Sequence, residues 1–309
     1  MRDGGAAILE DVAFEITAGE VLALVGESGC GKSMTALSLM RLVPKPLRLA
    51  ADVRMVFDGH DITELSVPQM RALRGASISM IFQEPTTSLN PVRTVGDQVS
   101  EAIRLHEKVS ARAARARVIE IFERTGIPDP VSRFDAYPHQ LSGGLKQRVM
   151  IAMALVMKPR LLIADEPTTA LDVTVQAQIM ELLRELQRDL GTAIVLITHD
   201  LGVVNELADR VAVMYGGRVV EQGTRLELLK DPRHPYTQGL LRAIPSAGRR
   251  GKALEEIAGL VPAPGEGPMG CRFATRCPRV FEPCADLRPA RSAASATHAA
   301  WCHALEDGG

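Results

Sequence analysis

The stretch from Gly26 to Ser33 constrains the fold of this chain more than any other feature of the sequence. It reads GESGCGKS, follows the apolar run VLALV at residues 21–25, and precedes a helical pattern from Met34 to Leu42. A strand, a glycine-rich loop and a helix in this order predict a phosphate-binding loop, because glycines let backbone N–H groups converge at the positive end of a helix. The candidate nucleotide-binding residues are Gly26, Glu27, Ser28, Gly29, Cys30, Gly31, Lys32 and Ser33.

Two residues at the end of this loop have specific chemistry. Lys32 can place a positive charge at the β- and γ-phosphates, and Ser33 can offer a hydroxyl to Mg²⁺. The chain has 309 residues, of which 46% are hydrophobic, so it can bury one large α/β domain and an appendage around such a loop.

Strand patterns alternate with helical patterns along most of the chain, which predicts an α/β fold with a parallel sheet. Besides residues 21–25, strands are expected at Ile8–Ile16, Val53–Phe57, Ile78–Phe82, Arg160–Asp165 and Ala193–Thr198. Helical patterns dominate from Thr94 to Met157 and predict a helical insertion at about residues 87–157. Residues 211–215 and 218–221, which flank two glycines, predict a hairpin.

Short motifs follow one another in a characteristic order. They are the phosphate loop, Gln83 after a strand, Leu141-Ser142-Gly143-Gly144, Asp165-Glu166 at a strand end, Leu171-Asp172, and His199 after another strand. Their order and spacing resemble the ATPase subunit of an ATP-binding-cassette (ABC) transporter over nearly the whole chain. The resemblance implies the ABC variant of the P-loop NTPase fold, with a parallel-sheet core, an antiparallel β subdomain and the helical insertion.

The resemblance also implies ATP and Mg²⁺ as cofactors and a role for each strand-end residue. Asp165, together with Ser33 and Gln83, is expected at the Mg²⁺ ion, which takes few protein ligands. Glu166 is expected to accept a proton from the attacking water. His199 is expected to hydrogen-bond the γ-phosphate, and Gln83 to contact both the metal and the water.

A second loop with anion-binding character begins at Ser142-Gly143-Gly144, although the chain has only one complete phosphate loop. In the family this loop, here Leu141 to Leu145 with Gln147 nearby, covers ATP bound to a partner subunit, and Leu171-Asp172 lies at the dimer seam. Leu145 stands where the family usually has glutamine, and Gln147 follows two residues later. A second ABC ATPase chain is therefore an expected partner.

A narrower resemblance comes from the stretches at residues 84–91, 234–237 and 240–245 and from the cysteine-containing segment 271–303. Together they resemble the dipeptide/oligopeptide importer ATPases, whose nearest relatives serve nickel importers. The implied function couples ATP hydrolysis to the uptake of di- or oligopeptides across the cytoplasmic membrane. Import of nickel or another small solute, a soluble ABC ATPase acting on ribosomes or DNA, and a metal-sensing module are the alternatives.

Composition shifts to alanine, arginine, glycine and proline past Pro245, which predicts an ATPase domain at 1–245 and an extension at 246–309. Four of the five cysteines lie there with the spacing C-x5-C-x6-C-x17-C: Cys271, Cys277, Cys284 and Cys302. In a reducing cytosol this crowding favours metal ligation over disulfides. Zn²⁺ and a [4Fe–4S] cluster fit the spacing equally well, and the resemblance favours the cluster. Four free thiols are the remaining alternative.

The expected assembly is a peripheral one on the cytoplasmic face of the membrane. Its partners are a second ATPase, most often a different chain, two membrane permeases and, indirectly, an extracytoplasmic substrate-binding protein. No uncharged apolar run reaches the roughly 18 residues that span a bilayer. The net charge of −1 supplies no basic field for nucleic acid. The family's adenine-stacking aromatic would precede Met1, so we expect either a truncated start or weaker binding of the base.

Overall fold

The computed structural model describes residues 2–3, 6–84, 88–169, 171–243 and 256–305. The chain divides into two compact units, the first comprising residues 1–16, 21–53 and 197–309 and the second residues 17–20 and 54–196. Residues 85–87 and 244–245, which belong to stretches used for the narrower resemblance, lie outside the described residues, as does Met1. The predicted boundaries at residues 87, 157 and 245 stay predictions.

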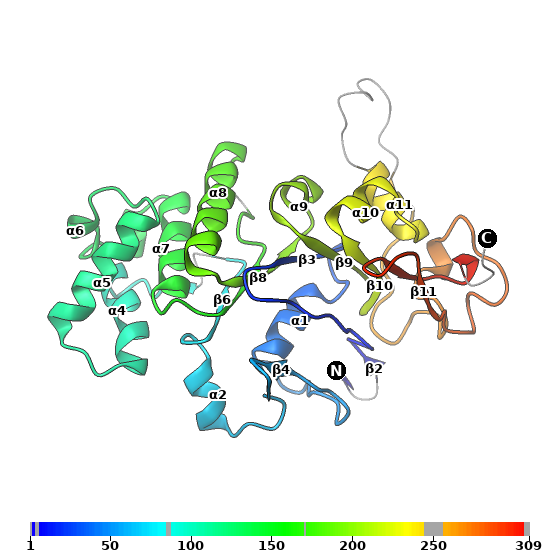
Figure 1. The fold of residues 1–309 in the computed structure, drawn as a ribbon, viewed down its shortest axis with the longest axis horizontal. Coiled ribbons are helices and arrows are strands. Elements are labelled where there is room, and N and C mark those ends of the chain that lie inside the picture. The colour runs from blue at the N-terminus through cyan, green and yellow to red at the C-terminus, as the bar shows by residue number, and fades with distance from the viewer. Residues whose placement is uncertain (1, 4–5, 85–87, 170, 244–255, 306–309) are drawn as a thin grey trace. The chain divides into compact units, whose positions relative to one another are not determined.

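The first unit is built on a mixed sheet, whose strands are β3 (Val21–Val25), β9 (Arg210–Tyr215), β10 (Arg218–Thr224), β12 (Ala299–Trp301) and β11 (Arg291–Ala293). Their order is β11-β12-β10-β9-β3 (Figure 1). β3 and β9 run parallel, while β9/β10, β10/β12 and β11/β12 are antiparallel. The predicted hairpin is confirmed, and its second strand extends to Thr224.

The other elements of the first unit are α1 (Lys32–Leu39), α9 (Leu201–Leu207), α10 (Arg225–Lys230), α11 (Pro235–Arg242), η3 (Ala274–Arg276), η4 (His303–Leu305) and the short ladder of β1 (Arg2–Asp3) with β2 (Ala6–Ala7). A separate cysteine-rich extension is not confirmed, because β12 pairs with β10 and residues 256–305 share the compact unit of β3.

Three fully buried rings, of Tyr215, Tyr236 and Phe273, pack with centroids 4.7–5.3 Å apart.

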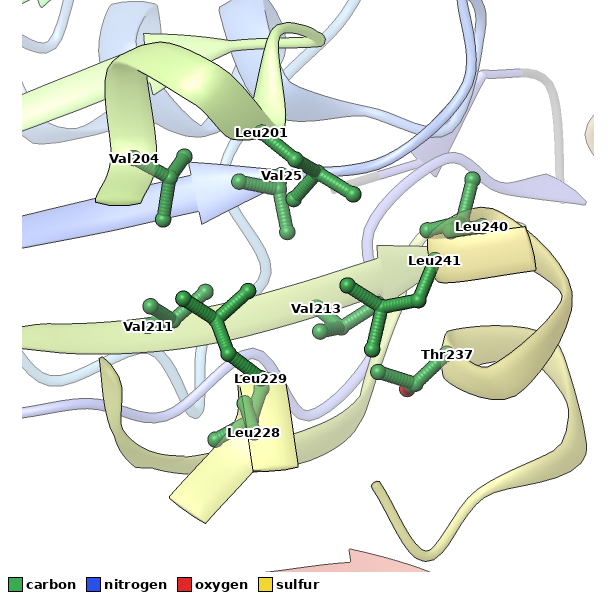
Figure 2. Close-up of a pocket in the computed structure, with 10 residues that line it drawn as sticks. All are labelled: Val25, Leu201, Val204, Val211, Val213, Leu228, Leu229, Thr237, Leu240 and Leu241. Carbon is green, nitrogen blue, oxygen red and sulfur yellow. The ribbon is translucent and has the colours of Figure 1, made fainter. Parts of the chain in front are cut away.

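A small apolar cavity lies in the core of the first unit, between β3, β9 and the helices α9, α10 and α11 (Figure 2). All of its lining residues except Thr237 are valines or leucines. Val25, the last residue of β3, is one of them and directly precedes the phosphate loop. The base of that loop is therefore packed against helices that lie about 200 residues further along the chain.

The strand expected over Ile8–Ile16 is not present in the structure. Asp11 has a positive φ of 49°, which breaks the extended conformation in the middle of this segment. The backbone N–H of Glu10 instead donates to the carbonyl of Gly217 at 2.9 Å. The loose alternation in the sequence was thus a misleading signal, because it was not accompanied by a continuous pairing strand.

The second unit contains the parallel strands β6 (Ile78–Ile81) and β7 (Leu161–Asp165), with β8 (Ala193–Thr198) next to β7 in the strand order. The expected strand at 53–57 is reduced to β4 (Val56–Phe57), which pairs with β5 (His60–Asp61). The helix α8 (Val173–Leu190) follows β7 and buries a stripe that includes Ile179, Leu183 and Leu186. The strand, loop and helix order predicted for residues 160–190 is confirmed.

Helices dominate the rest of this unit; the sequence predicts those within residues 94–157 but not the one at residues 67–73. They are α2 (Val67–Leu73), α4 (Val95–His106), α5 (Ala111–Arg124), α6 (Pro130–Arg133), η1 (Pro138–Gln140) and α7 (Gly143–Leu155). The helices α4, α5 and α7 pack on one another (Figure 1) and bury Val99, Phe122 and Ile151 completely. Within the described ranges, no helix has both the length and the apolar character needed to span a lipid bilayer.

Candidate functional site

The phosphate loop connects the fully buried strand β3 to α1 in the first unit. Gly26, Gly29 and Gly31 all have positive φ angles, of 153°, 81° and 106°. At Gly26 a Cβ atom would lie 2.3 Å from the carbonyl oxygen of Met214, so the position has no room for a side chain. The loop therefore depends on glycine both for its conformation and for its close approach to β9.

Lys32 lies within this loop, and its side chain is buried. Its Nζ donates to the carbonyl oxygens of Gly26 at 2.7 Å and Glu27 at 3.1 Å. An ammonium held by loop carbonyls is well placed to exchange them for phosphate oxygens. Ser33 follows as the second residue of α1. Burial raises the pKa of the Cys30 thiol, so this cysteine remains protonated at neutral pH.

His199 follows β8 and is exposed, in the first unit. The next residue, Asp200, begins α9: its Oδ1 accepts from the backbone N–H groups of Gly202 at 2.7 Å and Val203 at 3.4 Å. This cap fixes the turn that carries His199 at the carboxyl end of the strand.

In the second unit, Glu166 is held at the end of β7. Asp165, the last residue of β7, is buried, and Glu166 has a positive φ of 47° that turns the chain out of the strand. Its Oε2 accepts from Gln83 Nε2 at 3.1 Å and from Thr169 Oγ1 at 2.8 Å. The structure thus brings Gln83 and Glu166 together at the carboxyl ends of two neighbouring parallel strands. A carboxylate oriented by two donors is suited to orienting and deprotonating a water.

The loop at Ser142 begins α7. Ser142 Oγ caps the helix by accepting from the N–H of Leu145 at 3.4 Å, and Ser142 and Gly143 are exposed. Gln147, by contrast, is buried inside the helix packing, and its Nε2 has no hydrogen-bond partner among the described residues. The glycine-rich turn is therefore accessible, whereas the side chain of Gln147 is not.

The loops at Gly144 and Leu171 lie close together in the second unit. A Cβ on Gly144 would lie 3.0 Å from Val175 Cγ1, and one on Gly143 would lie 3.8 Å from Leu171 Cδ2. Asp172 is exposed and caps α8 by accepting from the N–H of Val175 at 2.9 Å. Two segments that the sequence assigned to one dimer surface are thus neighbours.

The four C-terminal cysteines all line one pocket of the first unit, together with His234 and His303. All are free thiols. Burial, and then repulsion from the other three cysteines, raises the pKa of Cys271 to about 11. In the described part of the chain, however, no group of three or more histidine, cysteine or acidic side chains is placed so that it could hold a metal ion. The predicted [4Fe–4S] cluster and its Zn²⁺ alternative are therefore not supported, because the sulfurs share a pocket without forming a ligand set.

Sequence reasoning missed several residues that contact the phosphate loop or the cysteine pocket. Tyr236 Oη accepts from the N–H of Glu27 at 2.9 Å, and Arg276 forms an ion pair with the Glu27 carboxylate. His234 is buried in the wall of the cysteine pocket. The stretch at 234–237 resembles a family pattern but carries no sequence signal of these contacts, and nothing in the sequence near Arg276 indicates a partner at residue 27.

The buried strand, glycine loop and helix of the first unit define a P-loop nucleotide-binding protein. The sequence matches the model of the family described as ABC transporter over residues 9–169, and that of the oligopeptide/dipeptide transporter C-terminal region over residues 220–284. The chain belongs to the ABC transporter family, as the sequence motifs predict.

Sequence similarity to known proteins extends along nearly the whole chain. The dipeptide transport ATP-binding protein DppD of Bacillus subtilis (strain 168) is 50% identical over 299 residues, which cover 97% of this chain and 89% of that protein. DppD of Escherichia coli (strain K12) is 48% identical over 302 residues, covering 97% of this chain and 92% of that protein.

Solved structures confirm the ABC ATPase fold. The structure of cbiO1 from Clostridium perfringens, part of the ABC transporter complex cbiONQ, has a TM-score of 0.62 and 36% identity, and covers 72% of this chain and 84% of that chain. The dimeric ATP-binding cassette MJ0796, in a post-hydrolysis state bound to ADP and Pi, has a TM-score of 0.63 and 29% identity, and covers 71% of this chain and 90% of that chain.

Proposed function

We propose that this chain is the ATP-hydrolysing subunit of an importer that takes up di- and oligopeptides across the cytoplasmic membrane. The observation that carries the proposal is the 50% identity, over 97% of the chain, to a dipeptide transport ATP-binding protein. The match of residues 220–284 to the oligopeptide/dipeptide transporter C-terminal region points to the same cargo class. Neither observation favours the import of nickel or the role of a soluble ABC ATPase that acts on ribosomes or DNA.

The phosphates of ATP are proposed to bind the loop from Gly26 to Ser33, with Lys32 exchanging its carbonyl partners for phosphate oxygens. Ser33, Gln83 and Asp165 are the proposed residues at Mg²⁺, and their oxygen atoms are the ligand type this ion prefers. When bound, Mg²⁺ neutralises charge on the transferred phosphoryl group.

Proton transfer is assigned to Glu166. Its contacts with Gln83 and Thr169 hold the carboxylate in one orientation, in which it accepts a proton from the attacking water. His199, exposed at a strand end, is proposed to donate a hydrogen bond to the γ-phosphate.

The loops at Ser142-Gly143 and Leu171-Asp172, of which only Leu171 is partly buried, are proposed to contact ATP bound to a second ABC ATPase subunit, so that ATP closes the pair. Two permeases would follow this movement, with a substrate-binding protein on the outer side. The chain would then lie at the cytoplasmic face of the membrane as a peripheral subunit, and a heterodimer is the proposed form of the ATPase pair.

Transport by the reconstituted complex tests this function. The full chain, its partner ATPase, the permeases and the binding protein are placed in liposomes, and ATP hydrolysis and solute uptake are measured with dipeptides, longer peptides and Ni²⁺. We expect peptides to stimulate both activities severalfold. Stimulation by Ni²⁺ alone would replace the peptide proposal by the nickel one. A transport role would be refuted if no solute changed the rate of ATP hydrolysis and the chain sedimented with ribosomes.

The four cysteines line one pocket but are not placed as a ligand set in the described part of the chain. On the family resemblance alone, they are proposed as ligands of a [4Fe–4S] cluster, with Zn²⁺ as the alternative. One feature of the pocket fits an occupant that accepts hydrogen bonds: its wall contains the buried His234. His234 Nδ1 accepts from the N–H of Tyr236, so its neutral ring carries a proton on Nε2, and Nε2 has no partner among the described residues. Bound metal would staple a segment that has little apolar core of its own.

Metal analysis of anaerobically purified protein checks this assignment. A cluster should give broad visible absorption with iron and acid-labile sulfide, whereas zinc should give a colourless protein with one Zn²⁺ per chain. Cys271→Ser should lose the metal, while Cys30→Ser, which alters the one cysteine outside the pocket, should retain it. Metal-free protein with four thiols that titrate would show that the pocket binds neither.

A further inference from the structure

Arg276, to which no role is assigned above, lies against the phosphate loop within the first unit. It ends η3 and directly precedes Cys277. Its guanidinium forms a two-pronged ion pair with Glu27, the second residue of the loop: Nη1 donates to Oε2 at 2.7 Å and Nη2 donates to Oε1 at 3.0 Å. Only 4% of the Arg276 side chain is exposed. Paired, charge-assisted bonds of this kind are strong and fix both partners in direction.

The orientation of the guanidinium is set by further contacts. Nε donates to the carbonyl of Ala258 at 2.8 Å, and Nη2 donates to the carbonyl of Ile257 at 2.9 Å. Nη1 also donates to Tyr215 Oη at 3.3 Å. The hydrogen bonds to Glu27, ahead of every other cause, raise the pKa of Arg276 above its ordinary range, so the side chain stays charged. The guanidinium of Arg276 is thus held in one orientation and is not a mobile surface charge.

The backbone of Glu27 is held as well, by a residue of α11. Its N–H donates to Tyr236 Oη at 2.9 Å, and the Tyr236 ring packs on Tyr215 and Phe273. Phe273 immediately precedes η3, which ends at Arg276. Side chain and backbone of one loop residue are therefore both anchored to residues more than 200 positions away.

The negative charge of Glu27 lies in the loop that is expected to bind the phosphates of ATP. The carbonyl of Glu27 accepts from Lys32 Nζ at 3.1 Å, so Glu27 directly adjoins the lysine expected to bind phosphate. An unpaired carboxylate at this place would repel a nucleoside triphosphate, which carries several negative charges. Arg276 cancels that charge and keeps the carboxylate turned toward itself.

We propose that Arg276 is a positioning residue for the phosphate loop: it holds Glu27 in place and neutralises its carboxylate, and thereby sets the affinity for MgATP. The inference rests on the proposed binding of ATP phosphates by this loop. Arg276 acts through Glu27 and makes no contact of its own with the nucleotide.

A double-mutant cycle in the full chain tests the proposal, with MgATP affinity measured by calorimetry and thermal unfolding followed in parallel. Arg276→Gln should weaken binding by on the order of tenfold, because Glu27 is left unpaired. Glu27→Gln removes the carboxylate that Arg276 neutralises, so adding it to Arg276→Gln should restore binding to the level of Glu27→Gln alone. Arg276→Lys, which keeps the charge and loses the two-pronged geometry, should fall between wild type and Arg276→Gln.

Arg272→Gln is the matched control. Arg272 is a nearby, largely buried arginine that pairs with Glu10 at 3.1 Å, outside the phosphate loop, and its loss should change affinity by less than about twofold. Unchanged MgATP binding by Arg276→Gln, or a double variant as weak as Arg276→Gln, would overturn the inference. A wild-type chain that binds no MgATP would instead overturn the proposed function together with it.

Discussion

Replacing Glu166 by glutamine is expected to lower the rate of ATP hydrolysis by roughly 10²–10⁴-fold while leaving MgATP binding nearly intact. The amide keeps the size of the side chain and can still accept from Gln83 and Thr169, which contact Oε2 in the structure. It cannot take a proton from water. The variant should therefore bind ATP and remain associated with its partner ATPase, which phosphate release and light scattering with the partner subunit can measure.

Glu181→Gln is the control for this variant. Glu181 is an exposed carboxylate on α8 whose ion pair with Arg184 spans 3.4 Å, so its removal should leave hydrolysis unchanged. Hydrolysis by Glu166→Gln at the wild-type rate would remove Glu166 from its role as the base. Weak MgATP binding by the same variant would place Glu166 in nucleotide binding instead.

Gly26→Ala is expected to weaken MgATP binding by about tenfold or more. The new Cβ would lie 2.3 Å from the carbonyl oxygen of Met214 and 2.8 Å from Cys30 Sγ, so β9 or the loop has to move. Forcing a methyl group into such a site costs about 1–3 kcal/mol. A shift of the loop would also move the carbonyl of Gly26, which accepts from Lys32 Nζ. Calorimetric titration with MgATP, together with a thermal unfolding curve, measures both effects.

Gly29→Ala separates crowding from backbone conformation in the same loop. Gly29 also has a positive φ, of 81°, but a Cβ there would meet nothing within 4 Å. In Gly29→Ala only the left-handed backbone conformation of the new alanine should cost free energy, about 1 kcal/mol. The affinity for MgATP should therefore fall less than in Gly26→Ala. Equal losses for the two variants would show that space next to Met214 is not what requires glycine at position 26.

The parts of the fold that were predictable are those whose information is local. Residues 21–42 carry strand, loop and helix signals in direct succession, and the structure has β3, the loop and α1 there. The contact between Gln83 and Glu166 was also foreseeable, because both follow strands that the predicted topology places in one parallel sheet.

Other parts depend on contacts between distant residues that leave no local pattern. Glu27 and Arg276 are 249 positions apart, and neither has neighbours that indicate the other. The strands β11 and β12 are short and rich in alanine, and β12 is defined by its pairing with β10 and β11 rather than by a local pattern. The segment at 8–16 shows the reverse, since its alternation looks like a strand although no continuous partner is present.

The discontinuity of the first unit has a consequence for synthesis of the protein. Val21, at the start of β3, is hydrogen-bonded to Asp209, 188 residues later, and Gly217 donates its N–H to the carbonyl of Cys30. At a translation rate of 5–20 residues per second, the strand waits roughly 10 to 40 seconds after leaving the ribosome before β9 exists to cover it. The nascent chain thus carries an apolar segment in need of protection, and its phosphate loop takes shape only after the second unit has been made.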